Sequence, residues 1–249
     1  DHGGRGSHPS IESALRKYTA LTARTGIMST VTRLNAKHLT RVAEHARHLG
    51  VTAMKTILFY PQGRGAEHPV DLSPTAEDLI EGQRALVAAV ESGWFDDFEI
   101  VPVLIYLNNI LSNRRISGCQ RPGGCMAANE LISITAKGDI DGCDCRPGKA
   151  LRIGSLRTST IAAAREGPAG AGIRQQFKLL PSACAECDFR AICGGPCRGK
   201  STCANPTSEL ECIASRALIG AIFESLSRSG RLIEYAARHQ RPSHRRVDA

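Results

Sequence analysis

The stretch Cys184-Ala-Glu-Cys187-Asp-Phe-Arg-Ala-Ile-Cys193-Gly-Gly-Pro-Cys197 decides how the rest of the sequence is interpreted. Its four cysteines follow the spacing C-x2-C-x5-C-x3-C, and two glycines precede the last of them. Thiolates are soft ligands, and four of them in a charged stretch favour zinc or an iron–sulfur cluster over a packed core. Glycines let the backbone turn sharply and approach an inorganic centre closely. We therefore interpret this stretch as a metal-binding loop.

Length and composition indicate a globular protein. The chain has 249 residues, of which 42% are hydrophobic, enough to bury a core. The sequence shows no apolar run of transmembrane length and no secretory signal, so we expect a cytoplasmic protein without a membrane partner. A reducing compartment disfavours disulfides, and ten cysteines there suggest bound metal.

The sequence carries a net charge of +8. Part of this excess lies near the C-terminus, in Arg238-His-Gln-Arg241 and His244-Arg245-Arg246. No aromatic-rich or other nucleic-acid motif accompanies the charge. We therefore interpret it as a solvated basic tail and expect no nucleic-acid partner.

Helical and strand patterns alternate in the first part of the chain, which predicts the α/β class with parallel β/α units. The helices are expected at about 11–24, 37–49 and 73–91, and the strands at 27–32, 53–59 and 98–106. Three units do not close a barrel, so the strand at 27–32 is expected to expose an unpaired edge. The pattern looks like the later half of a β/α barrel.

The composition changes from Ser117 onward. We expect a hairpin over 131–135 and 139–143, a short helix at 156–165 and a loop at 168–172. One or two helices are expected over 208–238, with a break near Gly230, followed by a disordered tail at 241–249. We divide the chain into 1–116, a half barrel, 117–214, a cysteine-rich domain, and 215–249, a helix with the basic tail.

The cysteine count matches two four-coordinate centres. Eight cysteines would fill them: Cys119, Cys125, Cys143, Cys184, Cys187, Cys193, Cys197 and Cys212. Cys145 and Cys203 are left over, and either is able to replace a neighbour or to remain a free thiol. Two zinc sites are the alternative, but only Cys184 and Cys187 have the spacing of a zinc knuckle. The irregular spacings favour iron–sulfur clusters.

At this point the sequence resembles a known family. The pattern C-x12-G-x4-C from Cys125 to Cys143, followed by the metal-binding loop and a last cysteine, resembles the SPASM domain of radical S-adenosylmethionine (SAM) enzymes that mature peptides and proteins. The resemblance implies two auxiliary [4Fe–4S] clusters. One would be held by Cys119, Cys125, Cys143 and Cys197, and the other by Cys184, Cys187, Cys193 and Cys212.

The preceding part is similar to the later half of the radical SAM core. The resemblance rests on Arg5-Gly6, 26–35, 49–51 and Pro61-Gln-Gly-Arg64. It implies that a 5′-deoxyadenosyl radical abstracts hydrogen from a peptide or protein substrate, with flavodoxin or ferredoxin as electron donor. Asp144 matches the proposed base of anaerobic sulfatase-maturing enzymes, and Arg5 matches an arginine that meets the SAM carboxylate. The alternatives are a solvated turn aspartate and a loop charge.

The sequence departs from that family in two respects: it has no cysteine before Cys119, and it lacks the glycine-rich strand end that binds the SAM amino group. The C-x3-C-x2-C loop that holds the SAM-cleaving cluster is therefore missing. We expect a fragment or truncated form of a maturase, with SAM and a third [4Fe–4S] cluster only in the full-length enzyme. The alternatives are a non-catalytic iron–sulfur module that binds a peptide or relays electrons, and a structural zinc protein, so whether the chain itself is an enzyme stays open.

Overall fold

The computed structural model describes the chain except for residues 1–5, 117–118, 122–123, 146–150, 199–206 and 240–249. The chain forms two compact units. The first unit contains residues 1–107 and 213–249, and the second unit contains residues 108–212. This division groups residues 215–249 with the first unit, whereas the sequence predicted a separate segment there.

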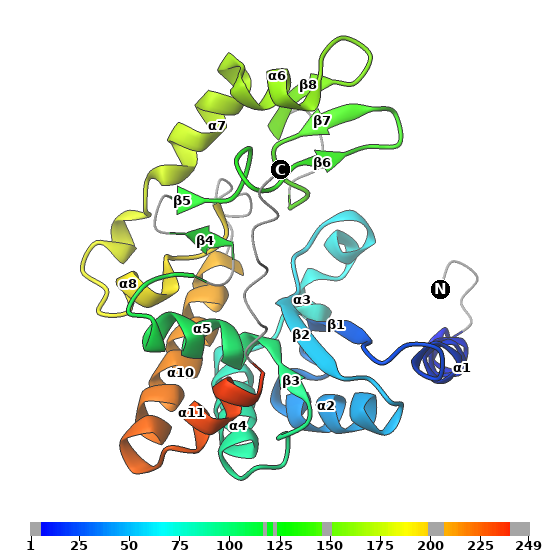
Figure 1. Ribbon diagram of the computed structural model, residues 1–249, viewed down its shortest axis with the longest axis vertical. Coiled ribbons are helices and arrows are strands. Elements are labelled where there is room, and N and C mark those ends of the chain that lie inside the picture. Colours follow the sequence, from blue (N-terminus) through cyan, green and yellow to red (C-terminus); the bar gives the residue numbers. More distant parts are fainter. Residues whose placement is uncertain (1–5, 117–118, 122–123, 146–150, 199–206, 240–249) are drawn as a thin grey trace. The chain divides into compact units, whose positions relative to one another are not determined.

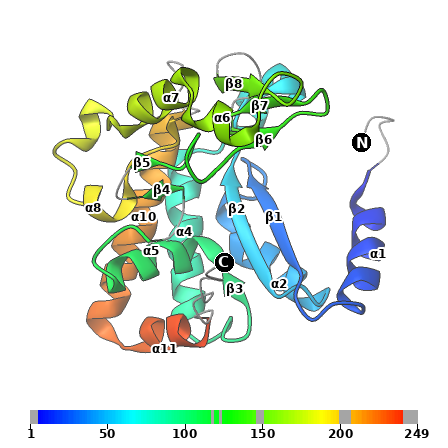
Figure 2. The same cartoon turned by 45° about the horizontal axis from the view of Figure 1, so that its top comes forward.

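The first unit contains a parallel sheet, as the sequence predicted. Its strands are β1 (Gly26–Val31), β2 (Ala53–Leu58) and β3 (Glu99–Ile100), in the order β1-β2-β3 (Figures 1 and 2). The register pairs Gly26 with Ala53 and Ala53 with Glu99. Among the described strands β1 pairs only with β2, so the expected unpaired edge is present.

Helices precede and connect these strands. They are α1 (His8–Thr19), the short 3-10 helix η1 (Ala36–His38), α2 (Leu39–His48), the short η2 (Gly63–Glu67) and α3 (Pro69–Leu72), and α4 (Ala76–Glu91). The side chain of Thr75 caps α4, because its hydroxyl accepts a hydrogen bond from the Asp78 N–H, so this helix begins after the expected position 73. Gly82 on α4 packs directly on η1: a Cβ there would lie 1.9 Å from the carbonyl oxygen of Ala36.

The predicted strand at 98–106 is wrong for most of its length. The strand β3 has two residues, and the helix α5 (Val101–Leu111) follows at once. Val103 and Leu107 are fully buried and four residues apart, which is the spacing of one helix face. A short apolar run does not distinguish a buried strand from a buried helix by periodicity.

Two C-terminal helices end the described chain, α10 (Thr207–Arg228) and α11 (Arg231–Arg238), and they confirm the predicted break near Gly230. The buried Tyr235 joins α11 to the first unit's sheet, because its hydroxyl accepts a hydrogen bond from the Ile100 N–H and donates one to the Phe98 carbonyl. The predicted tail at 241–249 lies outside the described residues. None of the described helices combines the length and apolar character needed to span a membrane.

The second unit contains two small antiparallel sheets (Figure 2). One pairs β4 (Gln120–Arg121) with β5 (Gly124–Cys125), and the other has the order β6 (Ser133–Ile134), β7 (Asp139–Asp141), β8 (Arg152–Ser155). The β6–β7 pair confirms the predicted hairpin, whereas β8 was missed.

Helices complete the second unit. They are α6 (Ile161–Glu166), α7 (Pro168–Lys178), the 3-10 helix η4 (Ser182–Cys184) and α8 (Arg190–Cys193). The helix expected at 156–165 therefore starts later, at α6. The loop predicted at 168–172 is wrong, because Pro168 begins α7, where a missing N–H costs nothing. Ile173 and Phe177 on α7 are buried, and this packing outweighs the two glycines near the start of the helix.

Candidate metal centres

The predicted metal-binding loop, residues 184–197, is shaped by two short helical turns and a reversal of the backbone. The N–H of Cys187 bonds to the carbonyl of Cys184 in the first turn, and the N–H of Cys193 bonds to the carbonyl of Phe189 in α8. Gly194 ends α8 with φ 76°, and Gly195 follows with φ 84°. Two successive left-handed residues favour glycine at both positions, since other residues are strained there.

One group of cysteines gathers around this loop, and we call it the loop group: Cys184, Cys187, Cys193 and Cys212. The Cys184 thiol is buried, and burial raises its pKa. Electrostatic interactions with the thiols of Cys193, Cys212 and Cys187 raise the pKa further. Such interactions act over several ångströms, so they indicate that these four cysteines, which span 29 sequence positions, lie near one another in the second unit.

A second group forms beside the β6–β7 hairpin, and we call it the hairpin group: Cys119, Cys125, Cys143, Cys145 and Cys197. Burial raises the pKa of the Cys125 thiol, while a hydrogen bond with the Ala127 backbone lowers it. The thiols of Cys197, Cys143 and Cys119 raise the pKa of Cys125 further, which makes them its neighbours.

Cys145 also belongs to the hairpin group. Its N–H donates to the Cys143 sulfur at 3.4 Å, and its thiol is hydrogen-bonded with the thiols of Cys143 and Cys197. These bonds lower the pKa of Cys143 and raise that of Cys145. Five thiols therefore meet where a four-coordinate centre needs four. The sequence signal for the fifth thiol was the C-x-C spacing of Cys143 and Cys145 at the end of the predicted hairpin. The other cysteine without an assigned centre, Cys203, lies outside the described residues.

The hairpin group is anchored in a small core. Cys143 is buried and packs in one cluster with Ile140, Ile173 and Phe177, among others. The backbone next to Cys143 is fixed as well, because the N–H of Gly142 bonds to the Leu151 carbonyl at 2.8 Å. Cys143 is thus held in place by packing and by strand hydrogen bonds.

The residues present fit a soft metal centre at each group. All the donors are thiols, and none of the described cysteines forms a disulfide. A Cβ on Gly195 would lie 3.1 Å from the Cys184 sulfur, so the glycine leaves the space that a centre bound to this sulfur would need. The backbone donors on the sulfurs of Cys143 and Cys125 are the kind of hydrogen bond that tunes cluster ligands. Both zinc and iron–sulfur clusters match this donor set.

The two non-cysteine candidates have different outcomes. Asp144 is exposed and lies directly beside the hairpin group, where its carboxylate accepts a weak hydrogen bond from the Cys143 thiol at 3.7 Å. It is therefore accessible to a molecule that approaches this end of the hairpin. Arg5 lies outside the described residues.

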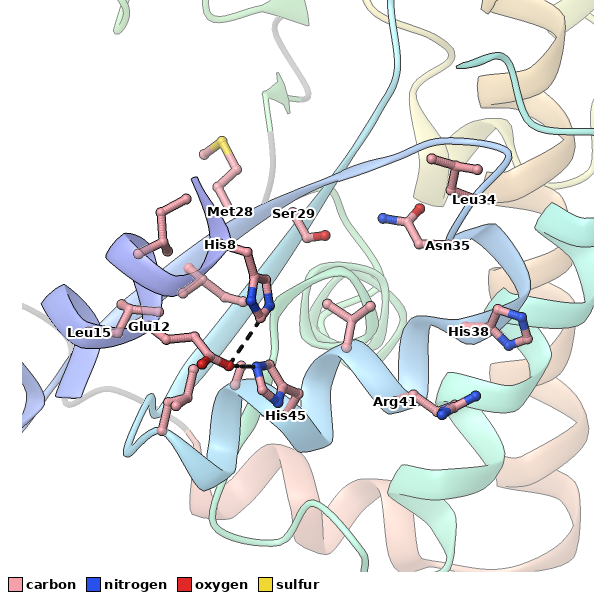
Figure 3. A pocket seen from close by; sticks show the side chains of 15 residues that line it. His8, Glu12, Leu15, Met28, Ser29, Leu34, Asn35, His38, Arg41 and His45 are labelled. Carbon is pink, nitrogen blue, oxygen red and sulfur yellow. Dashed lines mark ion pairs between the residues drawn. The ribbon is translucent and has the colours of Figure 1, made fainter. Parts of the chain in front are cut away.

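The first unit has a pocket of about 790 Å³ between α1, β1 and α2 (Figure 3). Figure 3 shows Glu12 between the imidazoles of His8 and His45, and the His45 Nε2 lies 2.6 Å from the Glu12 carboxylate. The two histidine side chains are 73% and 53% exposed. We interpret this cluster as a solvated ion pair, which contributes little to stability.

Comparison with known proteins gives a structural likeness only. No family model matches the sequence, and no curated protein matches it. Three similar solved structures are of anSMEcpe, an anaerobic sulfatase-maturating enzyme of the radical SAM/SPASM type: the native protein with bound AdoMet, and the same with AdoMet and either the Cp18Cys or the Kp18Cys peptide.

The likeness extends over nearly the whole chain. The TM-scores are 0.75, 0.75 and 0.74, at identities of 18%, 17% and 18%. The matches cover 95–96% of this chain but only 63–65% of anSMEcpe, so the chain spans less than two thirds of that protein. The chain therefore shares the fold of anSMEcpe over this span, a partial β/α fold with a small domain, as the alternation of helices and strands and the family resemblance led us to expect.

Proposed function

We propose that this chain is the auxiliary-cluster part of a radical SAM/SPASM maturase that acts on a peptide or protein. The single observation that carries the proposal is the gathering of distant cysteines into two groups. The ligands would be Cys119, Cys125, Cys143 and Cys197 in the hairpin group, and Cys184, Cys187, Cys193 and Cys212 in the loop group. The peptides in the anSMEcpe structures support a peptide substrate here.

Two [4Fe–4S] clusters would supply one-electron transfer at these positions, with flavodoxin or ferredoxin as the donor in a reducing cytoplasm. Hydrogen abstraction by a 5′-deoxyadenosyl radical would belong to the full-length maturase, because this sequence has no cysteine before Cys119. We assign Arg5 to the SAM carboxylate in that enzyme.

The chain's own residues would position the substrate and take up a proton. Asp144 is exposed, so its carboxylate is able to receive a substrate proton at an Oδ atom. If Cys143 binds metal as a thiolate, its proton no longer engages Asp144 and the carboxylate is left available as a base. The hairpin core fixes Cys143, and Asp144 follows it directly, which keeps the base beside the centre.

Anaerobic reconstitution with iron and sulfide tests the proposal, read out by metal analysis and the visible spectrum. We expect about eight irons per chain, four for each centre. Cys125→Ala and Cys187→Ala should each remove about half of the iron, and Cys203→Ala is the matched control that should leave it unchanged. Bound zinc without colour would contradict the proposal and identify a structural zinc protein.

The five thiols of the hairpin group need a separate comparison. Cys119 is exposed whereas Cys145 is half-buried, and both are close to Cys143 or Cys125. Cys119→Ala should lower the iron content and Cys145→Ala should not. The opposite result would replace Cys119 by Cys145 in the ligand set.

A non-catalytic iron–sulfur module is the second candidate, because no C-x3-C-x2-C loop is present in this sequence. Such a module would bind peptide or relay electrons, with both clusters intact. Supplying the loop on a separate polypeptide distinguishes the two functions: SAM cleavage that depends on Cys187 supports the maturase, and peptide binding without SAM cleavage supports the module.

A further inference from the structure

A buried cation lies in the metal-binding loop, directly after Cys197. Arg198 is only 5% exposed, and long charged side chains are rarely buried to this degree. Its guanidinium folds back on the loop: Nη1 donates to the Pro196 carbonyl at 3.3 Å and Nη2 donates to the Gly194 carbonyl at 3.0 Å. The charge is therefore held in one place by the same reversal that brings the cysteines together.

The guanidinium is close to the sulfur of Cys184. An ideal Cβ on Gly195 would lie 3.1 Å from that sulfur and 3.2 Å from both terminal nitrogens of Arg198. The sulfur and each of these nitrogens are therefore at most about 6.3 Å apart, the sum of the two distances, which is within the range of a strong interaction at a buried site. Because Gly195 has no side chain, the Cys184 sulfur and the Arg198 guanidinium both lie close to its backbone.

Arg198 interacts with both groups of cysteines. The guanidinium lies near the Cys184 sulfur, Arg198 follows Cys197 directly in the chain, and Cys125 is an electrostatic neighbour of both Cys197 and Arg198. Cys184 belongs to the loop group, and Cys125 and Cys197 belong to the hairpin group. Arginine keeps its charge at any pH at which the protein works, so this is a permanent positive charge beside two sets of thiolates.

We propose that Arg198 is a shared positioning residue that raises the reduction potentials of both centres by placing one buried positive charge beside each. This inference rests on the proposed function, since it requires clusters at both groups. Reduction adds a negative charge to a cluster, and a nearby fixed cation stabilises the reduced form more than the oxidised form. One charge acting on both centres also links them, because its loss lowers both potentials together.

The test is a redox titration of the reconstituted full chain, monitored by electron paramagnetic resonance, in Arg198→Gln and Arg198→Lys. Arg190→Gln is the matched control, because Arg190 is an exposed arginine of the same loop that also bonds a loop carbonyl. Iron analysis accompanies each titration. To assign the potentials, the titrations are repeated in the Cys125→Ala and Cys187→Ala backgrounds, each of which should hold one centre.

We expect Arg198→Gln to keep its iron and to lower both potentials by at least about 59 mV, a tenfold change in a one-electron equilibrium. Arg198→Lys should recover most of the shift, and Arg190→Gln should show a far smaller one.

Full iron content with unshifted potentials, or a shift at one centre alone, would overturn the inference. If Arg198→Gln does not load iron, Arg198→Met replaces it as the neutral variant: unaltered iron with both potentials lowered would support the role of charge placement, and unaltered iron with potentials equal to those of the unmodified chain would refute it. A chain that binds no iron before mutation would overturn the proposed function itself, and this inference with it.

Discussion

Tyr235 on α11 tests how strongly the C-terminal helix stabilises the first unit. The side chain is 1% exposed, and its hydroxyl bridges the strand end. It accepts from the Ile100 N–H at 2.6 Å and donates to the Phe98 carbonyl at 2.9 Å. Burial raises the pKa of Tyr235, so the hydroxyl stays protonated and keeps both bonds at neutral pH.

Tyr235→Phe keeps the ring but leaves two backbone groups without this partner in a buried position. Each unsatisfied group costs about 1–3 kcal/mol, so the free energy of unfolding should fall by about 3 kcal/mol for the two adjacent groups. By the same reasoning the Ile100 amide should exchange its hydrogen about a hundredfold faster. The substitution removes only the hydroxyl oxygen, so no cavity adds to the loss of stability.

Urea unfolding measures the free energy, with linear extrapolation. Trp94 is the only tryptophan and lies in the first unit, so its fluorescence follows that unit. Tyr106→Phe is the matched control: its hydroxyl donates to Ser215 at 2.8 Å in a half-buried setting, where removal should cost less than about 1 kcal/mol. Equal losses in the two variants would refute the assignment of Tyr235 as a buried bridge.

Two further predictions follow from the local geometry. Gly195→Ala should lower the iron content by about half, because the new Cβ would lie 3.1 Å from the Cys184 sulfur and the residue has φ 84°. Gly63→Ala is the control: this residue has φ 54° and open space around it, so the iron content should not change. Intact iron loading in Gly195→Ala would contradict the close approach. The pKa of Asp96 is lowered in the folded state, and the main cause is its hydrogen bond with Arg238. The ionised carboxylate therefore stabilises the folded state above the unfolded pKa of about 3.9, and this contribution is lost as the pH falls through the lower folded pKa. Unfolding measured from pH 6 to pH 2 should therefore show a shallower loss in Asp96→Asn, and parallel curves would rule out this linkage.

Part of the fold was predictable because short-range chemistry fixes it. The alternation of helical and strand patterns predicted β1 and β2 with their parallel order, and turn chemistry predicted the β6–β7 hairpin. The run at 98–106 was not predictable in the same way: its residues are apolar throughout, and their neighbours decide whether they bury as a strand or as a helix. The helix α7 was missed for a similar reason, since its first turn has the composition of a loop and its stability comes from burying Ile173 and Phe177.

The sequence by itself determined which donor atoms the site offers. The number and spacing of the cysteines predict soft metal ligands, and the adjacent glycines predict the backbone reversal that the structure has, because both predictions depend only on residue type and local geometry. Only the tertiary structure decided which thiols meet: Cys145 joins the hairpin group, and Arg198 is buried against thiols from both groups. Spacing along the chain does not encode these meetings, since they depend on how the β6–β7 hairpin and the metal-binding loop pack within the second unit.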